Sequence, residues 1–203
     1  MGSQSSSAST TFKCFQFPSL CMKKHLKFTL ILTGILLTRT YDAYCTALFT
    51  PDLKREGNFL VSVFHFHWRG LLLTIGCGLL YVVYALYINT YKQVNLFPAQ
   101  KHLSFGQFVV QSLYGPGESW TALLYKFPAD KQKLHYVFGY ILSRGLLWVG
   151  VVTTVMWGLI NHITMYYTRF HTHTGTLGLA LGGVAVVAYH YFNRQYAAYK
   201  LLE

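Results

Sequence analysis

The chain has 203 residues, enough for one domain and hardly two, and its net charge is +11. It is 53% hydrophobic and only 11% charged, with a mean hydropathy of +0.31, whereas a soluble domain carries about 25% charged residues. This balance excludes an ordinary soluble domain and indicates contact with lipid. The basic residues flank apolar segments, as the positive-inside rule describes, so we expect a lipid bilayer and no nucleic acid as partner.

Residues 1–24 are predicted to form a tail, and residues 25–203 a membrane domain. The first half of the tail is rich in Ser and Thr, which is typical of disorder. Its second half, residues 12–22, interleaves aromatic residues with Lys13 and two cysteines, a composition that suits a segment lying on a membrane or docking on a partner. An unstructured tail with incidental aromatic residues is the alternative.

The first apolar segment, about 28–49, follows a basic stretch, as the apolar region of a signal peptide also does. No small-residue cleavage site follows the Leu-rich core, so we predict a retained first span. About 22 helical residues are long enough to cross a hydrocarbon core of about 30 Å. The next residues, Thr50, Pro51 and Asp52, are typical of a helix start.

The second apolar stretch, 59–91, is too long for one perpendicular span. We predict an interfacial turn or helix as far as Trp68, followed by a span over 69–91. Two further spans are predicted at 136–163 and 175–192.

The polar connection 92–134 separates the second span from the third, and its mildly amphipathic part, 104–114, is predicted to lie on the membrane. The predicted fold is therefore all-α, an integral membrane four-helix bundle with an interfacial helix on each side. Most basic residues fall in the tail, the connection and the carboxyl terminus, which places both termini in the cytoplasm. A bacterial inner membrane is favoured, and an organelle membrane is the alternative.

Asp42 lies in the outer half of the first span, where a carboxylate is costly unless it has a partner or a function. At helical spacing it shares one polar face with Thr38, Cys45 and Thr46. One interpretation is an ion, proton or metal site. The other is that Asp42 pairs with Arg39, Arg69 or a tyrosine inside the bundle.

Histidines gather at the outer ends of the second and third predicted spans and in the loop that follows. Together with two carboxylates they are suitable ligands for zinc, iron or copper. The candidate ligands are Asp42, Glu56, His65, His67, His162, His171 and His173. No tight metal-binding motif is present, so a polar rim at the membrane interface is the alternative interpretation.

Arg144 lies within the third predicted span, with Tyr136 and Tyr140 two turns and one turn before it. We expect the side chain to reach toward the cytoplasmic face and lie over those rings. Binding of an anionic headgroup or a quinone-like ligand is the alternative.

Small residues recur on one face of the second span, at Gly70 and Gly78, and of the fourth span, at Gly178 and Gly182. Small faces let helices approach closely. Internal packing and contact with a partner subunit both agree with this pattern.

The run from Asp42 to Leu60 resembles a family of small bacterial multi-span membrane proteins of unassigned function. That family has an Asp and a Thr in the first span, a Thr-Pro-Asp-Leu-like turn, and a Glu-x-Asn-Pro-Leu start of the second span. The matching residues here are Asp42, Thr46, 50–53, Glu56, Asn58 and Leu60, with Phe59 in place of the Pro. The resemblance implies that Asp42, Thr46, Glu56 and Asn58 act together.

These observations favour a non-catalytic accessory or structural subunit of a larger membrane complex. One alternative is a membrane enzyme with an outward-facing metal or acid–base site built from Asp42, Glu56 and the histidines. Another is a small transporter or channel that uses Asp42 and Arg144 as polar waypoints. The sequence specifies no cofactor.

Overall fold

A computed structural model of the chain describes residues 18–53, 61, 63–128, 130–162 and 173–202. Every regular element within these ranges is a helix, as the predicted all-α fold requires. The helices are α1 (Pro18–Phe49), α3 (Trp68–Tyr91), α4 (Phe105–Tyr114), α5 (Ala122–Tyr125), α6 (Lys131–His162) and α8 (His173–Lys200).

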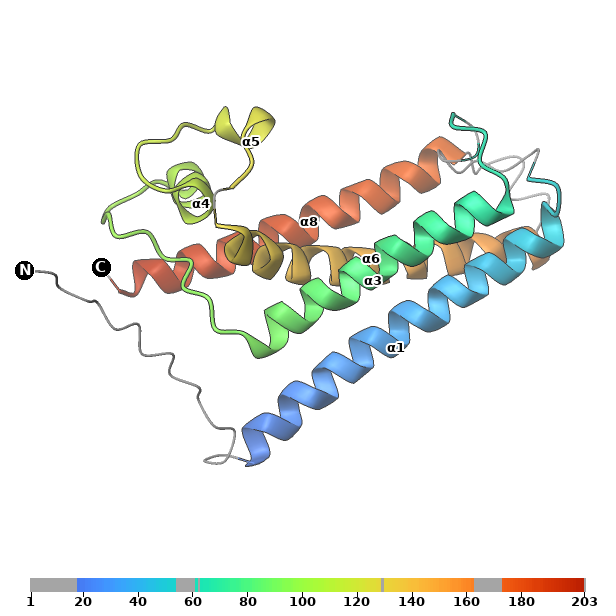
Figure 1. Ribbon diagram of the computed structural model, residues 1–203, viewed down its shortest axis with the longest axis horizontal. Coiled ribbons are helices and arrows are strands. Elements are labelled where there is room, and N and C mark those ends of the chain that lie inside the picture. The colour runs from blue at the N-terminus through green and yellow to red at the C-terminus, as the bar shows by residue number, and fades with distance from the viewer. Residues whose placement is uncertain (1–17, 54–60, 62, 129, 163–172, 203) are drawn as a thin grey trace, which may run out of the picture.

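Four long helices run alternately in opposite directions, and α6 packs against each of the other three (Figure 1). The start of α1, the end of α3, the start of α6 and the end of α8 lie together at one end of the molecule, here called the basic end. The start of α1 and the end of α8 are therefore on the same side of the helices.

Three of the four long helices in the described part of the chain are long and apolar enough to cross a membrane. They are α3, residues Lys131–Asn161 of α6, and residues Gly175–Lys200 of α8. The remaining predicted span, 28–49, is also helical because it lies within α1. Helix α1 is not among the three helices that are apolar enough to cross a membrane, since Arg39 and Asp42 interrupt its apolar stretch.

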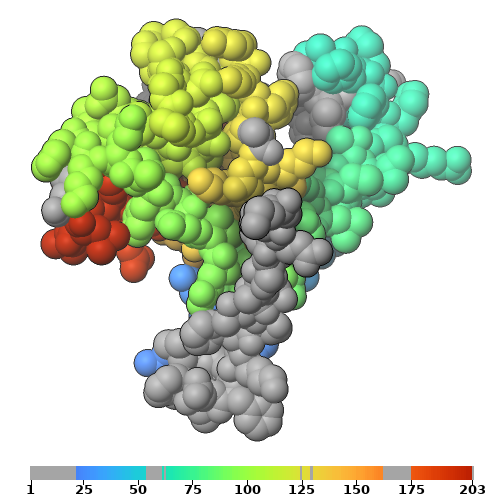
Figure 2. All heavy atoms as spheres, turned by 60° about the vertical axis from the view of Figure 1, so that its left-hand side comes forward, coloured from blue at the N-terminus to red at the C-terminus, as the bar shows by residue number. Residues whose placement is uncertain are grey.

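Helix α8 continues beyond the predicted end of its span, residue 192, because its last turns hold the connection between α3 and α6. Tyr196 Oη donates a hydrogen bond to the Leu103 carbonyl oxygen (2.9 Å), and Tyr199 Oη donates to that of Gln100 (2.7 Å). Phe108 of α4 is fully buried against both tyrosine rings. Figure 2 shows the connection, in green and yellow, beside the red carboxyl-terminal end of α8.

The predicted amphipathic segment 104–114 is confirmed as a helix. Ser104 and Gln107 form a reciprocal capping box at its start, which satisfies two backbone N–H groups that the first turn leaves free.

Glycines set the closest approaches to α6. A Cβ atom added at Gly139 would overlap the carbonyl group of Ala85 on α3. One added at Gly150 would overlap the Thr38 side chain on α1, and one at Gly183 of α8 would overlap Trp148 of α6. No rearrangement of a flexible side chain relieves the overlap at Gly139, because a backbone carbonyl is held by its own helix.

We therefore expect Gly139→Ala to destabilise the protein by about 1–3 kcal/mol, the usual cost of overpacking. The control is Gly78→Ala on α3, where an added Cβ meets nothing within 4 Å and alanine improves helix propensity by up to about 1 kcal/mol. The measurement is the thermal unfolding midpoint of each variant in detergent. Equal midpoints for the two variants would show that the contact between α3 and α6 is not as close as described.

Candidate functional site

Arg39, Asp42, Thr153 and Trp157 form a hydrogen-bonded group between α1 and α6, here called the α1–α6 polar cluster. The Arg39 guanidinium contacts the Asp42 carboxylate (Nη1–Oδ2 3.3 Å) and donates from Nη2 to Thr153 Oγ1 (2.9 Å). The indole Nε1 of Trp157 donates to Asp42 Oδ1 (2.8 Å). Both carboxylate oxygens of Asp42 thus accept a hydrogen bond.

Helical spacing brings these residues together. Arg39 and Asp42 are three residues apart on α1, and Thr153 and Trp157 are four apart on α6, so each pair lies on one face of its helix. Gly150, one turn before Thr153, lets α1 approach. The Phe49 ring of α1 stacks on Trp157 at a centroid distance of 5.4 Å.

In this geometry Asp42 forms an ion pair with Arg39. The side chains of Arg39 and Asp42 are 15% and 27% exposed, so two opposite charges are largely withdrawn from the surroundings and neutralise each other. Of the two interpretations drawn from the sequence, the structure shows the ion pair with Arg39. Of the other members of the predicted polar face, Thr38 donates to the Gly34 carbonyl oxygen of its own helix (2.9 Å), and Cys45 is buried.

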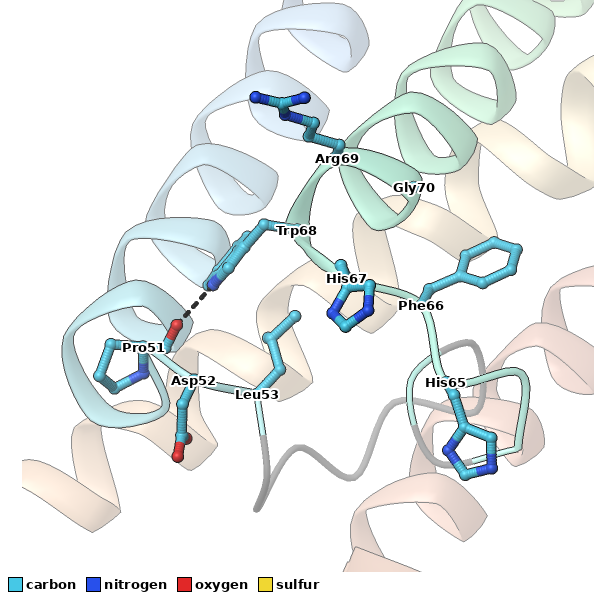
Figure 3. A pocket seen from close by; sticks show the side chains of 9 residues that line it. All are labelled: Pro51, Asp52, Leu53, His65, Phe66, His67, Trp68, Arg69 and Gly70. Carbon is cyan, nitrogen blue, oxygen red and sulfur yellow. Dashed lines mark hydrogen bonds between the residues drawn. The ribbon is translucent and has the colours of Figure 1, made fainter.

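His65 and His67 lie at the end of the helices opposite the basic end, in a shallow pocket of about 620 Å³ that is lined by the start of α3 and the segments before it. Its side chains are separated around the pocket and do not converge on one point (Figure 3). Trp68 closes one side by donating from Nε1 to the Pro51 carbonyl oxygen (2.7 Å). Residues 50–53 form a turn, and Leu53 has a φ of 57°, so a helix starting at Thr50 is wrong for these residues.

The predicted metal ligands are only partly within the described residues. Asp42 is engaged in the α1–α6 polar cluster, and in the described part of the chain no three His, Cys, Asp or Glu residues lie close enough to share a metal ion. Glu56, Asn58 and His171 lie outside the described residues, as do the side chains of His162 and His173.

Arg144 lies on α6 toward the basic end. Its guanidinium carbon is 3.7 Å from the centroid of the Tyr140 ring, and Nη1 donates to the Tyr140 carbonyl oxygen (3.3 Å) and to Ser143 Oγ (3.2 Å). The stacking that the sequence spacing suggests is therefore present with Tyr140. No carboxylate in the described residues pairs with this cation.

The four glycines singled out by sequence do not pack against another helix within the described chain. A Cβ added at Gly78, Gly178 or Gly182 would meet nothing within 4 Å, and one at Gly70 would meet only Phe66, at 3.5 Å. The close approaches are made by Gly139, Gly150 and Gly183.

Sequence reasoning missed the two partners of the ion pair on α6, which are Thr153 for Arg39 and Trp157 for Asp42. A signal was present, since Gly150, Thr153, Thr154 and Trp157 recur at intervals of three or four residues in an otherwise apolar segment. Nothing in the sequence shows that this face opposes Arg39.

Comparison with protein-family models, with curated proteins and with solved structures finds no match for the chain. The resemblance of the run from Asp42 to Leu60 therefore stays a prediction.

Removing one member of the ion pair leaves the other charge alone between two apolar helices. We expect Asp42→Ala to destabilise the protein by about 3–5 kcal/mol, the cost of breaking a buried ion pair. Replacing both charges, in Arg39→Leu/Asp42→Leu, should recover most of that loss because no lone charge remains. Thermal unfolding in detergent measures both. A double variant as unstable as Asp42→Ala would contradict a mainly electrostatic role for the pair.

Proposed function

We propose that the protein is a polytopic integral membrane protein with four transmembrane helices, and that it serves as a non-catalytic subunit of a larger membrane assembly. Three helices of suitable length and composition support the membrane location. The fourth crossing is assigned to α1, whose 32 residues span about 48 Å at 1.5 Å per residue.

The charges within α1 do not argue against this crossing. A lone Arg or Asp at the centre of a helix costs about 2.5–3.5 kcal/mol on insertion scales, and such residues normally face the bundle interior and pair with each other. Arg39 and Asp42 meet that condition in the α1–α6 polar cluster.

The basic end is proposed to face the cytoplasm. Basic residues in the first turns of α1, in the connection between α3 and α6, and at the end of α8 all belong to this end of the helices. The positive-inside rule assigns such an excess to the cytoplasmic side. The resemblance to bacterial multi-span proteins supports a bacterial inner membrane.

The proposal of a subunit role is based on the outward face of α8. Gly178, Gly182 and Ala185 follow one another at helical spacing, and all three are exposed. Only 11% of the residues in the apolar window of α8 are buried inside the chain, against 28% for α3 and for α6. The contacts of α8 with another long helix are made with α6, on the side where Gly183 meets Trp148.

Lipid alone covers exposed leucine and valine side chains without cost, so their exposure does not by itself indicate a protein partner. Small residues form one stripe on that face, and such stripes let a second helix approach closely enough for backbone contacts. A transmembrane helix of another subunit is the partner that fits a face of this shape at membrane depth.

The test is Gly182→Leu in the full chain, purified from its native membrane in mild detergent. Inside the chain the added side chain meets no atom at the Cβ position, so the variant should fold and unfold like the wild type. We expect the proteins that co-purify with the wild type to be lost or strongly reduced, because the leucine holds the two helices apart.

Leu177→Phe is the matched control, since it enlarges an exposed apolar residue of the same helix that is not three or four residues from Gly178, Gly182 or Ala185. It should keep the co-purifying proteins. A wild-type chain that purifies alone would overturn the subunit proposal, and a lone chain with one bound metal ion would favour the enzyme alternative.

A further inference from the structure

A second pocket, of about 380 Å³, lies at the basic end between the start of α1 and the end of α3. Lys24 and Lys27 line it from α1, Asn89 and Thr90 from α3, and Lys92 and Gln93 from the segment that follows. Its volume falls within the range of about 300–1,000 Å³ that small-molecule sites occupy.

Hydrogen bonds hold the surrounding helices in place. Asn89 Nδ2 donates to the Tyr136 carbonyl oxygen (3.0 Å), which joins the end of α3 to α6. Tyr91 Oη and His25 Nδ1 are 2.7 Å apart, which joins the end of α3 to the start of α1. The helices that surround the pocket are therefore joined to one another by hydrogen bonds.

The charge in and around this pocket is positive and unbalanced. Three lysines line it, no Asp or Glu does, and no described carboxylate forms an ion pair with Lys24, Lys27 or Lys92. Arg144 and Arg194 lie close enough to repel Lys27. These two cations add to the positive potential around the Lys27 ammonium.

The charges nearby do not compensate for this excess. The carboxyl end of α3 carries a partial charge of about −0.5 from its helix dipole, against three whole positive charges on the lysines. Asp130 accepts hydrogen bonds from the backbone N–H groups of Gln132 and Lys133 at the start of α6, and Glu118 pairs with Lys126. Like charges gathered around one cavity repel one another and destabilise the folded protein unless an anion binds among them.

We propose that this pocket binds a phosphate group, carried either by the headgroup of an anionic phospholipid or by a free phosphate anion. Lysine ammonium groups bind phosphate as point charges, and the hydroxyl of Thr90 and the amides of Asn89 and Gln93 supply neutral donors at the same site. The pocket lies where the helices end, and basic pockets between membrane helices at that depth hold lipid headgroups.

The proposal explains a feature that the positive-inside rule leaves open. That rule requires basic residues on one side of the membrane but not their convergence from α1 and the connection on one cavity. A bound anion also reverses the repulsion among Lys27, Arg144 and Arg194, and it links α1 to α3 across their ends.

The experiment uses the full chain in nanodiscs of phosphatidylcholine with and without phosphatidylglycerol, followed by native mass spectrometry after release in detergent. The wild type should retain phosphatidylglycerol as a discrete adduct. Lys24→Gln/Lys27→Gln should weaken retention on the order of tenfold or more, since each basic residue near a membrane surface contributes about 1 kcal/mol. Titration of inorganic phosphate into delipidated protein, followed by calorimetry, tests the free anion.

Lys23→Gln/Lys101→Gln is the control, because it removes the same charge from the same end of the molecule without touching the pocket. It should retain the adduct, which separates a site from general attraction and from a change of membrane orientation. Retention of phosphatidylglycerol alone identifies a lipid site, and phosphate binding in detergent identifies a free-anion site. Equal loss in both double variants, equal retention in both, or no binding of either probe by the wild type would overturn the proposal.

Discussion

Arg39 and Asp42 place two opposite charges in the second half of α1, and the position of that helix depends on how those charges are satisfied. They neutralise each other, and Thr153 and Trp157 of α6 each add one hydrogen bond. Because the polar atoms face α6, the outward side of α1 is left with apolar residues such as Leu30, Leu37 and Leu48. The same contacts fix the direction of α1 along α6, and so they also fix where its first residues meet the end of α3.

Helix α6 connects the features that bear on function. Glycines on or facing it let α1, α3 and α8 approach, and polar contacts occupy both halves of its length, with Trp157 toward one end and Arg144 toward the other. The contacts between α8 and α6 use one side of α8, which leaves the face of Gly178 and Gly182 outward. The proposed partner surface and the phosphate pocket therefore lie on different helices and depend on different residues, so each can fail without the other.

Much of the fold follows from the sequence, because long apolar segments and the amphipathic stretch after Ser104 are local patterns. Hydropathy predicts the spans of α3, α6 and α8, while α8 extends past residue 192 because Tyr196 and Tyr199 bind a connection almost a hundred residues away. The site is less predictable. Asp42 is conspicuous in the sequence, but its pairing depends on which faces of α1 and α6 oppose each other. The glycines that pack were missed for the same reason, since Gly139 and Gly182 are alike until their neighbours are known.

The claim that α1 crosses the membrane is tested most directly by labelling single cysteines from one side. In a background with the four native cysteines replaced by alanine, Lys23→Cys and Asp52→Cys place one thiol beyond each end of the apolar part of α1. A membrane-impermeant maleimide added to sealed, right-side-out vesicles should label the cysteine at 52 and leave that at 23 unlabelled until the vesicles are opened. Labelling of both thiols, or of neither, from the same side would contradict the crossing and with it the membrane role proposed for the α1–α6 polar cluster.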